Sequence, residues 1–389
     1  MPIFDEAAEL GTDTPQQLAT LIEAGLYDPD TPTARDRLQL LGELIGDGCT
    51  IEEMLRADAR GRLFALAGDR VLRPGRDTYT LREVADLLTT EPALIHQLWR
   101  ALGLRDVGLD TAIASPADVS ALPVCLGMRA AWGDEAMLSM ARTYSAAMDR
   151  IAHAEVDATR PIVENLSLDE SGSEAVTGRS WAAAAKVVPQ IGGLLDMMHR
   201  HHLENASRRA EQAMSADLAS RRLVRQAVGF VDLCGFTALS QTVGADTLAV
   251  WLSELEARVY ELAQDLDGRV VKFLGDAAMI VAARPAVLAD ILTTLVGRTE
   301  AFGEFRVRAG AAYGEVLAQD GDYFGAAVNL AARLVAEAEP ATIMVSPEFA
   351  DLLEAESFET ELLPARELRG FHDSITPYHL RRVGPVPMP

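Results

Sequence analysis

The chain has 389 residues and a mass of 41.9 kDa, which is long enough for two or three domains with separate hydrophobic cores. Its formal charge of −23 at pH 7 and its pI near 4.7 repel nucleic acid and anionic lipid at long range, so a general polyanion-binding function is disfavoured. Three widely spaced cysteines, Cys49, Cys125 and Cys234, form no CxxC pair. Neither a disulfide framework nor a zinc site is therefore expected.

No apolar run reaches the length of about 18 residues that a membrane-spanning helix needs. The N-terminus carries acidic residues where a signal peptide carries basic ones. We expect a cytoplasmic protein without a transmembrane segment, and peripheral lipid contact stays open.

Residues 1–164 contain repeated helix starts and little strand-like alternation. The segments Thr50 to Glu53 and Thr80 to Glu83 have the composition of capping boxes, in which side chains satisfy the free amides of a first helical turn. Thr14-Pro15 and Ser115-Pro116 mark two further starts. These signals predict an all-helical domain.

The apolar pattern from Tyr79 to Leu104 fits either a helix-turn-helix that binds DNA or a pair of helices packed into a core. No basic face accompanies the pattern, and packing explains it without a ligand. We favour packing.

Residues 165–180 are rich in Ser, Glu, Asp and Gly, which is typical of a linker. Apolar residues then recur at helical spacing from Trp181 to about Gln226, which predicts one long helix bent at Pro189. Residues 165–225 are thus expected to connect the helical domain to a third region, residues 226–389.

The third region alternates strands with helices. Strands are expected at 227–233, 270–274, 277–282, 305–316 and 342–345, and helices at 248–266, 285–302 and 325–338. The order β-α-β-β-α-β predicts an α+β, ferredoxin-like sheet, and we expect helices on one of its faces.

Lysine occurs only twice, at Lys186 and Lys272, whereas the other 33 of the 35 basic residues are arginine. Lys272 precedes the predicted hairpin turn Gly275-Asp276. An ammonium group is a compact point donor and a guanidinium a planar fork, so the retained lysine at this place indicates a chemical role. Survival of one lysine by chance is the plainer alternative.

Asp232 ends the first predicted strand, and a helix is expected to begin at Phe236 and Thr237. Helix-start amides suit phosphate, and a carboxylate beside them suits a hard cation. Asp276 lies at the tip of the hairpin whose strand can pair beside the first. Taken singly, Asp232 is as well explained as a helix cap and Asp276 as a turn residue.

Three segments, FVDLCGFT, KFLGDAAM and GDYFGAAVNLAARL, resemble the catalytic domain of class III adenylate cyclases in order, spacing and residue type. The resemblance covers roughly residues 226–382. It implies that Asp232 and Asp276 bind metal and that Lys272 and Asp322 recognise adenine. It further implies that Asn329 orients the ribose and that Arg333 stabilises the transition state.

The implied reaction converts ATP to 3′,5′-cyclic AMP and pyrophosphate with two Mg²⁺ or Mn²⁺ ions per active site. In this family the metal-binding residues come from one catalytic domain and the base-recognising and transition-state residues from its partner. A chain with one complete domain therefore implies a homodimer with two shared sites. Phe236 and Thr237 are further expected substrate-binding residues.

The layout, a helical N-terminal domain joined to one cyclase domain, also resembles actinobacterial cyclases that are regulated through the N-terminal domain, in some members by pH or fatty acids. Independently, His199, His201 and His202 cluster in the connecting helix, and histidine titrates near neutrality. They are candidate pH sensors beside Asp196 and Glu204, or a solvated helical patch. A fatty-acid pocket and a tight core remain equally compatible with the apolar N-terminal helices.

Four other functions are weighed against a regulated adenylate cyclase. Lys272 and Asp322 disfavour a guanylate cyclase, and the complete metal and transition-state positions disfavour a nucleotide-sensing scaffold without turnover. The acidic charge disfavours a DNA-binding regulator. A diguanylate cyclase is expected to carry a Gly-Gly-Asp/Glu-Glu-Phe signature, which is missing from the sequence.

Overall fold

The structure of the protein is a computed structural model. It describes residues 15–73, 75, 77–167, 173–213, 223–236, 240–297 and 306–384. The chain divides into two compact units, residues 1–200 and 201–389. The three-part division expected from the sequence stays a prediction.

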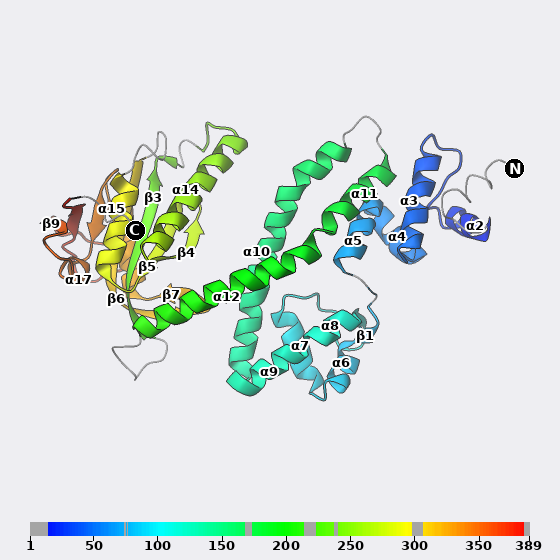
Figure 1. The fold of residues 1–389 in the computed structure, drawn as a ribbon, viewed down its shortest axis with the longest axis horizontal. Coiled ribbons are helices and arrows are strands. Elements are labelled where there is room, and N and C mark those ends of the chain that lie inside the picture. The colour runs from blue at the N-terminus through cyan, green and yellow to red at the C-terminus, as the bar shows by residue number, and fades with distance from the viewer. Residues whose placement is uncertain are drawn as a thin grey trace. The chain divides into compact units, whose positions relative to one another are not determined.

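The first unit holds two groups of helices, each around its own core (Figure 1). The first group consists of α2 (Pro15–Glu23), α3 (Ala34–Gly46), α4 (Ile51–Asp58), the 3₁₀ turn η1 (Leu63–Ala65), α5 (Leu66–Leu72) and α11 (Glu174–Ala185). Leu21, Leu40, Leu41 and Leu44 are completely buried in it. Thr50 and Glu53 form the capping box predicted at the start of α4.

The start of α11 corrects the prediction of a linker over residues 165–180, because a helix begins at Glu174 within it. The Ser173 hydroxyl accepts a hydrogen bond from the Val176 amide and caps the helix. Glu174 forms an ion pair with Arg37 at 2.8 Å. These polar residues look like linker composition in the sequence, but they are a helix cap and a contact between segments far apart in the chain.

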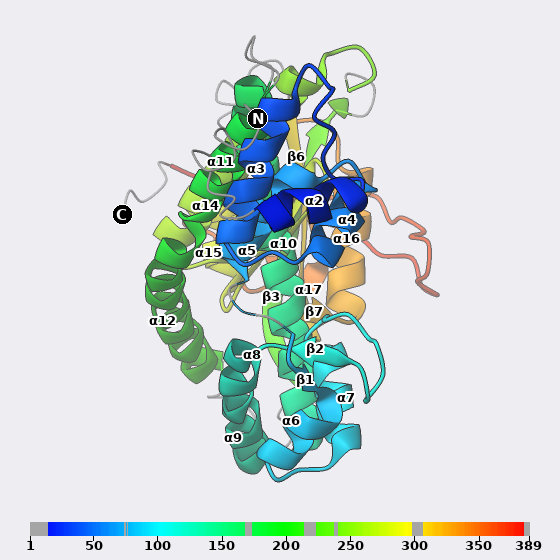
Figure 2. The ribbon, with the colours of Figure 1, turned by 90° about the vertical axis from the view of Figure 1, so that its right-hand side faces the viewer.

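The second group contains α6 (Leu81–Leu87), α7 (Pro92–Ala101), α8 (Pro116–Ala121), α9 (Pro123–Trp132) and the long α10 (Asp134–Ser167), gathered with two short strands (Figure 2). The strands β1 (Tyr79–Thr80) and β2 (Ala112–Ala114) pair antiparallel, a small exception to the all-helical expectation. Leu81, Val84, Ile95 and Leu98 are buried together. The helix pair from Tyr79 to Leu104 is therefore a packed core, as favoured.

The predicted single helix from Trp181 onward is wrong, because α11 ends at Ala185 and α12 begins separately (Val188–Ala213). Pro189 is the second residue of α12 and lacks the amide needed to continue the preceding helix. Along α12, Leu194, Met197, Met198 and Leu203 are all exposed. Residues 214–222 lie outside the described part of the chain.

The second unit is built on a sheet with strand order β4-β5-β3-β6-β8-β10-β9, and β7 pairs with β6 off this path. The strands are β3 (Leu223–Cys234), β4 (Arg269–Leu274), β5 (Ala277–Ala282), β6 (Arg306–Gln319), β7 (Asp322–Phe324), β8 (Ile343–Val345), β9 (Phe358–Leu362) and β10 (Tyr378–Arg382). The predicted α+β fold class is confirmed. Strands β7, β9 and β10 lie outside the strands predicted from the sequence.

Helices cover both faces of this sheet, so the expectation of one covered face is wrong. The helices α14 (Ala245–Asp265) and α15 (Pro285–Gly297) pack on the face that carries Ala227 and Val231. On the opposite face, α16 (Ala326–Glu337) packs against Val228 and Phe230. A side chain at Gly310 would meet the α16 backbone at 2.1 Å, so glycine there allows the helix to lie directly on β6.

A short helix, α17 (Pro347–Ala350), follows β8 and is capped by Ser346. In the described part of the chain, no helix combines the length and the apolar character required to cross a membrane.

Candidate active site

Asp232 and Asp276 lie at the same end of two neighbouring strands. Asp232 is the third residue from the C-terminal end of β3. It pairs with Ala277, the first residue of β5. The Leu233 amide donates a hydrogen bond of 3.3 Å to the Asp276 carbonyl, which ties the β4–β5 turn to β3. Gly275 in this turn has φ of +66°, a conformation that glycine adopts without strain.

The two carboxylates share one nearby cation, Arg308 on β6, which the sequence analysis missed. Arg308 pairs with Asp232 at 2.6 Å and donates to the Ala336 carbonyl near the end of α16. Burial raises the pKa of Asp276, and the negative charge of Asp232 raises it further. The signal in the sequence was an arginine placed opposite Asp232 in the neighbouring long strand.

This set of donors fits a hard divalent cation. Two carboxylates with one guanidinium leave a net negative charge, and burial together with the charge of Asp232 raises the pKa of Asp276. Among the described residues, no group of three or more acidic, histidine or cysteine side chains is placed to bind a metal. Phosphate oxygens and water would therefore complete the coordination shell.

Lys272 and Asp322 form an ion pair between β4 and the start of β7. Both side chains are partly buried, with relative exposures of 34% and 27%. The other Asp322 oxygen accepts a hydrogen bond of 2.8 Å from the Tyr323 amide. The structure thus brings together the two residues that the sequence assigned to adenine.

A β-bulge sets the direction of Lys272. The register of β4 against β5 shifts between Val270 and Lys272, so that Arg269 opposes Val281 and Lys272 opposes Met279. Residues three apart in a regular strand point to opposite faces, whereas one extra residue returns them to the same face. Met279 and Val281 both belong to the core under α16, so Arg269 and Lys272 share that face.

Asn329 and Arg333 lie one helical turn apart on the exposed side of α16, opposite the buried Ala327 and Ala331. In the described part of the chain, Arg333 has no carboxylate within ion-pair distance. Among the described residues, no hydrogen bond or ion pair joins Asn329 or Arg333 to Asp232, whose side chain pairs with Arg308. Their proposed roles are untested.

Phe236 follows β3 and packs partly against the core, and its carbonyl accepts a hydrogen bond of 2.8 Å from the Ser240 amide. Thr237 lies outside the described residues. Burial raises the pKa of the Cys234 thiol, so Cys234 is a poor source of thiolate.

His199, His201 and His202 are exposed on α12. The acids expected beside them have other partners: Asp196 pairs with Arg200 and Glu204 with Arg208. The role of the histidines stays a prediction.

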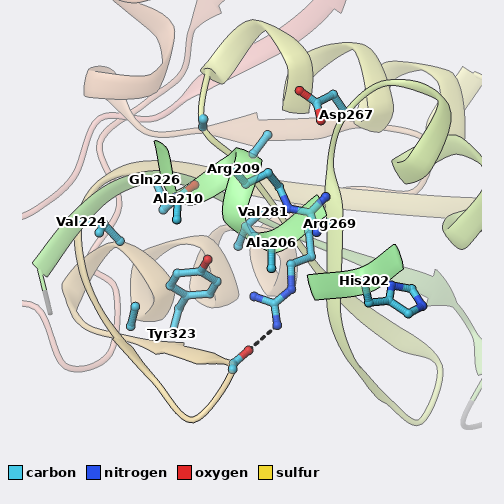
Figure 3. A pocket seen from close by; sticks show the side chains of 14 residues that line it. His202, Ala206, Arg209, Ala210, Val224, Gln226, Asp267, Arg269, Val281 and Tyr323 are labelled. Atoms are coloured by element: carbon cyan, nitrogen blue, oxygen red, sulfur yellow. Dashed lines mark hydrogen bonds between the residues drawn. The ribbon is translucent and has the colours of Figure 1, made fainter. Parts of the chain in front are cut away.

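A pocket of about 530 Å³ lies in the second unit, between α12 and the end of the sheet that carries the β6–β7 turn (Figure 3). His202 and Arg209 of α12 contribute to its wall. Arg269, Gly321 and Tyr323, which surround Asp322, form another part. The pocket therefore adjoins the Lys272–Asp322 pair.

Comparison with known proteins places the chain among the cyclases. Residues 219–382 match the Adenylate and Guanylate cyclase catalytic domain. The uncharacterized protein Rv2212 of Mycobacterium tuberculosis (strain H37Rv) is 41% identical over 331 residues, 85% of each chain. The pH-sensitive adenylate cyclase MT1302 of M. tuberculosis (strain CDC 1551) is 31% identical over 374 residues, 90% of this chain and 89% of that protein.

An adenylate cyclase of Streptomyces coelicolor is also 31% identical, over 80% of this chain and 84% of its own length. The similarity to this protein and to MT1302 extends well beyond the catalytic domain into the helical N-terminal unit. The chain therefore belongs to the class III adenylate cyclases.

Proposed function

We propose that this enzyme converts ATP to 3′,5′-cyclic AMP and pyrophosphate in a homodimer with two shared active sites. The observation that carries the proposal is the Lys272–Asp322 pair, a donor beside an acceptor on the sheet face that also carries Asp232. The reaction is attack of the ribose 3′-oxygen on the α-phosphorus, with pyrophosphate as the leaving group. It requires no covalent intermediate on the protein.

Base selection follows from hydrogen-bond chemistry. Adenine offers an acceptor at N1 and a donor at its exocyclic amine, which complement the Lys272 ammonium and the Asp322 carboxylate. Guanine presents the opposite pattern. A site that leaves buried groups unpaired with the wrong base discriminates by about 10⁴ in favourable cases. The two side chains hold each other in place until the base enters between them.

Asp232 and Asp276 would hold the divalent cations, Mg²⁺ or Mn²⁺, two per site. When bound, such ions acidify the 3′-hydroxyl and neutralise the phosphate oxygens. Arg308 pairs with the Asp232 carboxylate and also donates to the Ala336 carbonyl of α16, so it keeps Asp232 oriented. Arg333 would stabilise the charge that develops on the transferring phosphoryl group.

A homodimer would account for the exposed positions of Asn329 and Arg333 on α16. Asn329 and Arg333 point away from their own sheet, as residues that serve a partner's site would. We infer that each site takes Asp232 and Asp276 from one protomer and Lys272, Asp322, Asn329 and Arg333 from the other.

One assay tests the reaction. The purified full chain is incubated with Mg²⁺ or Mn²⁺ and either ATP or GTP across pH 5 to 8, and the cyclic product is identified by mass spectrometry. We expect cyclic AMP from ATP and little cyclic GMP from GTP. Absence of cyclic AMP under every condition would remove the proposed function.

We further propose that the N-terminal unit regulates the cyclase and that pH is one of its signals. The relative MT1302 is named a pH-sensitive adenylate cyclase, and three histidines lie exposed on α12 next to the catalytic unit in sequence. A fatty-acid effector stays a prediction from the layout of the chain alone.

Replacement of His199, His201 and His202 by Gln tests the pH proposal. If these side chains sense pH, the triple variant loses the dependence of activity on pH but retains turnover at one fixed pH. An unchanged pH profile would exclude the cluster as the sensor.

A further inference from the structure

Arg269, the first residue of β4, contacts both neighbours of Asp322. Its Nη2 donates a hydrogen bond of 2.5 Å to the Gly321 carbonyl, marked by the dashed line in Figure 3. Its guanidinium carbon lies 5.6 Å from the centre of the Tyr323 ring, within the range of a cation–π contact. Arg269 therefore holds the chain immediately before and immediately after Asp322.

The β6–β7 turn leads directly into Asp322, the first residue of β7. Asp320 and Gly321 have φ of +52° and +82°, and Gln319 pairs with Asp322 across this two-residue turn. Among the described strands, β7 has three residues and pairs only with β6. A short two-stranded ladder is marginally stable by itself. Contacts with the rest of the sheet, such as those that Arg269 makes, therefore help to fix the backbone that carries Asp322.

The bulge in β4 makes the contact possible. It places Arg269 on the same sheet face as Lys272, so one edge strand supplies both the partner of Asp322 and the support for its backbone. In the described part of the chain Arg269 has no carboxylate within ion-pair distance. Arg269 therefore contacts the turn through a hydrogen bond to the Gly321 carbonyl and a cation–π contact with the Tyr323 ring.

We propose that Arg269 is a positioning residue for base selection: it fixes the β6–β7 turn so that Asp322 meets the amine edge of adenine. This inference rests on the proposed reading of adenine by Lys272 and Asp322. Arg269 itself does not touch the reacting atoms. Its loss would blur the discrimination between ATP and GTP before it affects phosphoryl chemistry.

The guanidinium is suited to this position for a geometric reason. Its planar fork can donate to a carbonyl while its face or edge meets an aromatic ring, whereas a lysine ammonium supplies only the point donor. Arg269→Lys is therefore expected to retain part of the contribution of Arg269 to the ATP-over-GTP preference, and Arg269→Ala none of it. Tyr323→Leu removes the ring and leaves the carbonyl bond.

The test compares wild type, Arg269→Ala, Arg269→Lys and Tyr323→Leu as full chains. Dissociation constants for ATP and GTP are measured by calorimetry with Ca²⁺, and initial rates with Mn²⁺ are measured separately. Arg381→Ala is the matched control, because Arg381 is exposed on β10, far along the strand order from β4.

We expect Arg269→Ala to reduce the ATP-over-GTP binding ratio by about tenfold or more, which corresponds to about 1.4 kcal/mol. Its KM for ATP should rise more than its kcat falls. Arg269→Lys and Tyr323→Leu should each lose part of the ratio, and Arg381→Ala none. A generally less stable domain would instead lower the amount of active enzyme without changing the ratio.

Separate measurements of binding and turnover distinguish a failure of the proposed reaction from a failure of the proposed role of Arg269. If wild type binds ATP preferentially but forms no cyclic AMP, the proposed reaction fails and the binding ratios still decide the role of Arg269. If Arg269→Ala retains the wild-type ratio, or if wild type shows no preference between ATP and GTP, the inference is overturned.

Discussion

A mixture of two inactive variants tests whether active sites are shared between protomers. Asp232→Ala removes a carboxylate from the metal end of β3, and Arg333→Ala removes the exposed guanidinium of α16. In a homodimer of either variant both sites are defective. In the heterodimer one site carries both changes and the other carries neither.

The expected activity follows from this geometry. Random exchange of equal amounts gives about half heterodimers, each with one intact site of two, so the mixture should reach about one quarter of wild-type activity per protomer. The two variants are mixed, incubated to allow exchange, and assayed for cyclic AMP with Mn²⁺ and ATP. Each variant alone provides the baseline.

A second mixture is the matched control. Asp232→Ala mixed with Asp276→Ala places both changes in the same set of residues, so each site of the heterodimer retains one defect. This mixture should remain at the baseline. Recovery in both mixtures, or in neither although subunit exchange is demonstrated, would refute the assignment of the two residue sets to different protomers.

Three further outcomes are expected. Arg333→Ala should bind ATP as wild type does but turn over about 10²–10³-fold more slowly, as measured by binding and initial rates, and near-normal turnover would remove Arg333 from the mechanism. Lys272→Glu combined with Asp322→Lys should weaken the preference for ATP over GTP in competition assays, and full retention of ATP selectivity would contradict the reading of this pair. Glu53→Gln should lower the stability of the first helical group by about 1 kcal/mol at pH 7, seen as a lower thermal midpoint. Burial alone raises the pKa of Glu53, but hydrogen bonds from Thr50 and the charge of Arg70 outweigh burial and lower the pKa in the folded state. The stabilisation by Glu53 is therefore present above the pKa of the unfolded state and is lost as the pH falls through the pKa of the folded state. A gap between the midpoints that persists at pH values below the folded pKa of Glu53 would contradict this explanation.

Most of the sheet was predictable because its strands are apolar and its turns carry strong local signals. The strand 277–282 was predicted with the bounds observed for β5. The periodic pattern failed where polar residues serve a distant partner. Ser173 and Glu174 were attributed to a linker, yet they cap α11 and pair with a helix more than a hundred residues earlier in the chain. Local composition contains no information on that contact.

The site residues also divide into those whose placement the local sequence indicates and those whose placement it does not. The proximity of Asp232 and Asp276 follows from a hairpin beside a strand, which the sequence indicates. The direction of Lys272 depends on a bulge, and the sequence gives no separate sign of an extra residue in β4. Arg308 and Arg269 were missed because arginine is the common cation in this chain, so neither position stood out as Lys272 did.

The arrangement also limits how the N-terminal unit can act. Lys272, Asp322 and Arg269 support one another within a protomer, and so do Asp232 and Arg308. Each half of the proposed site is therefore preformed. In the proposed homodimer, a single protomer lacks only the juxtaposition of the two halves. A regulator that changes how two catalytic units face each other would switch both sites together without altering any catalytic side chain. Regulation of this kind should change kcat while the ATP-over-GTP ratio stays constant, because base selection is built within one protomer.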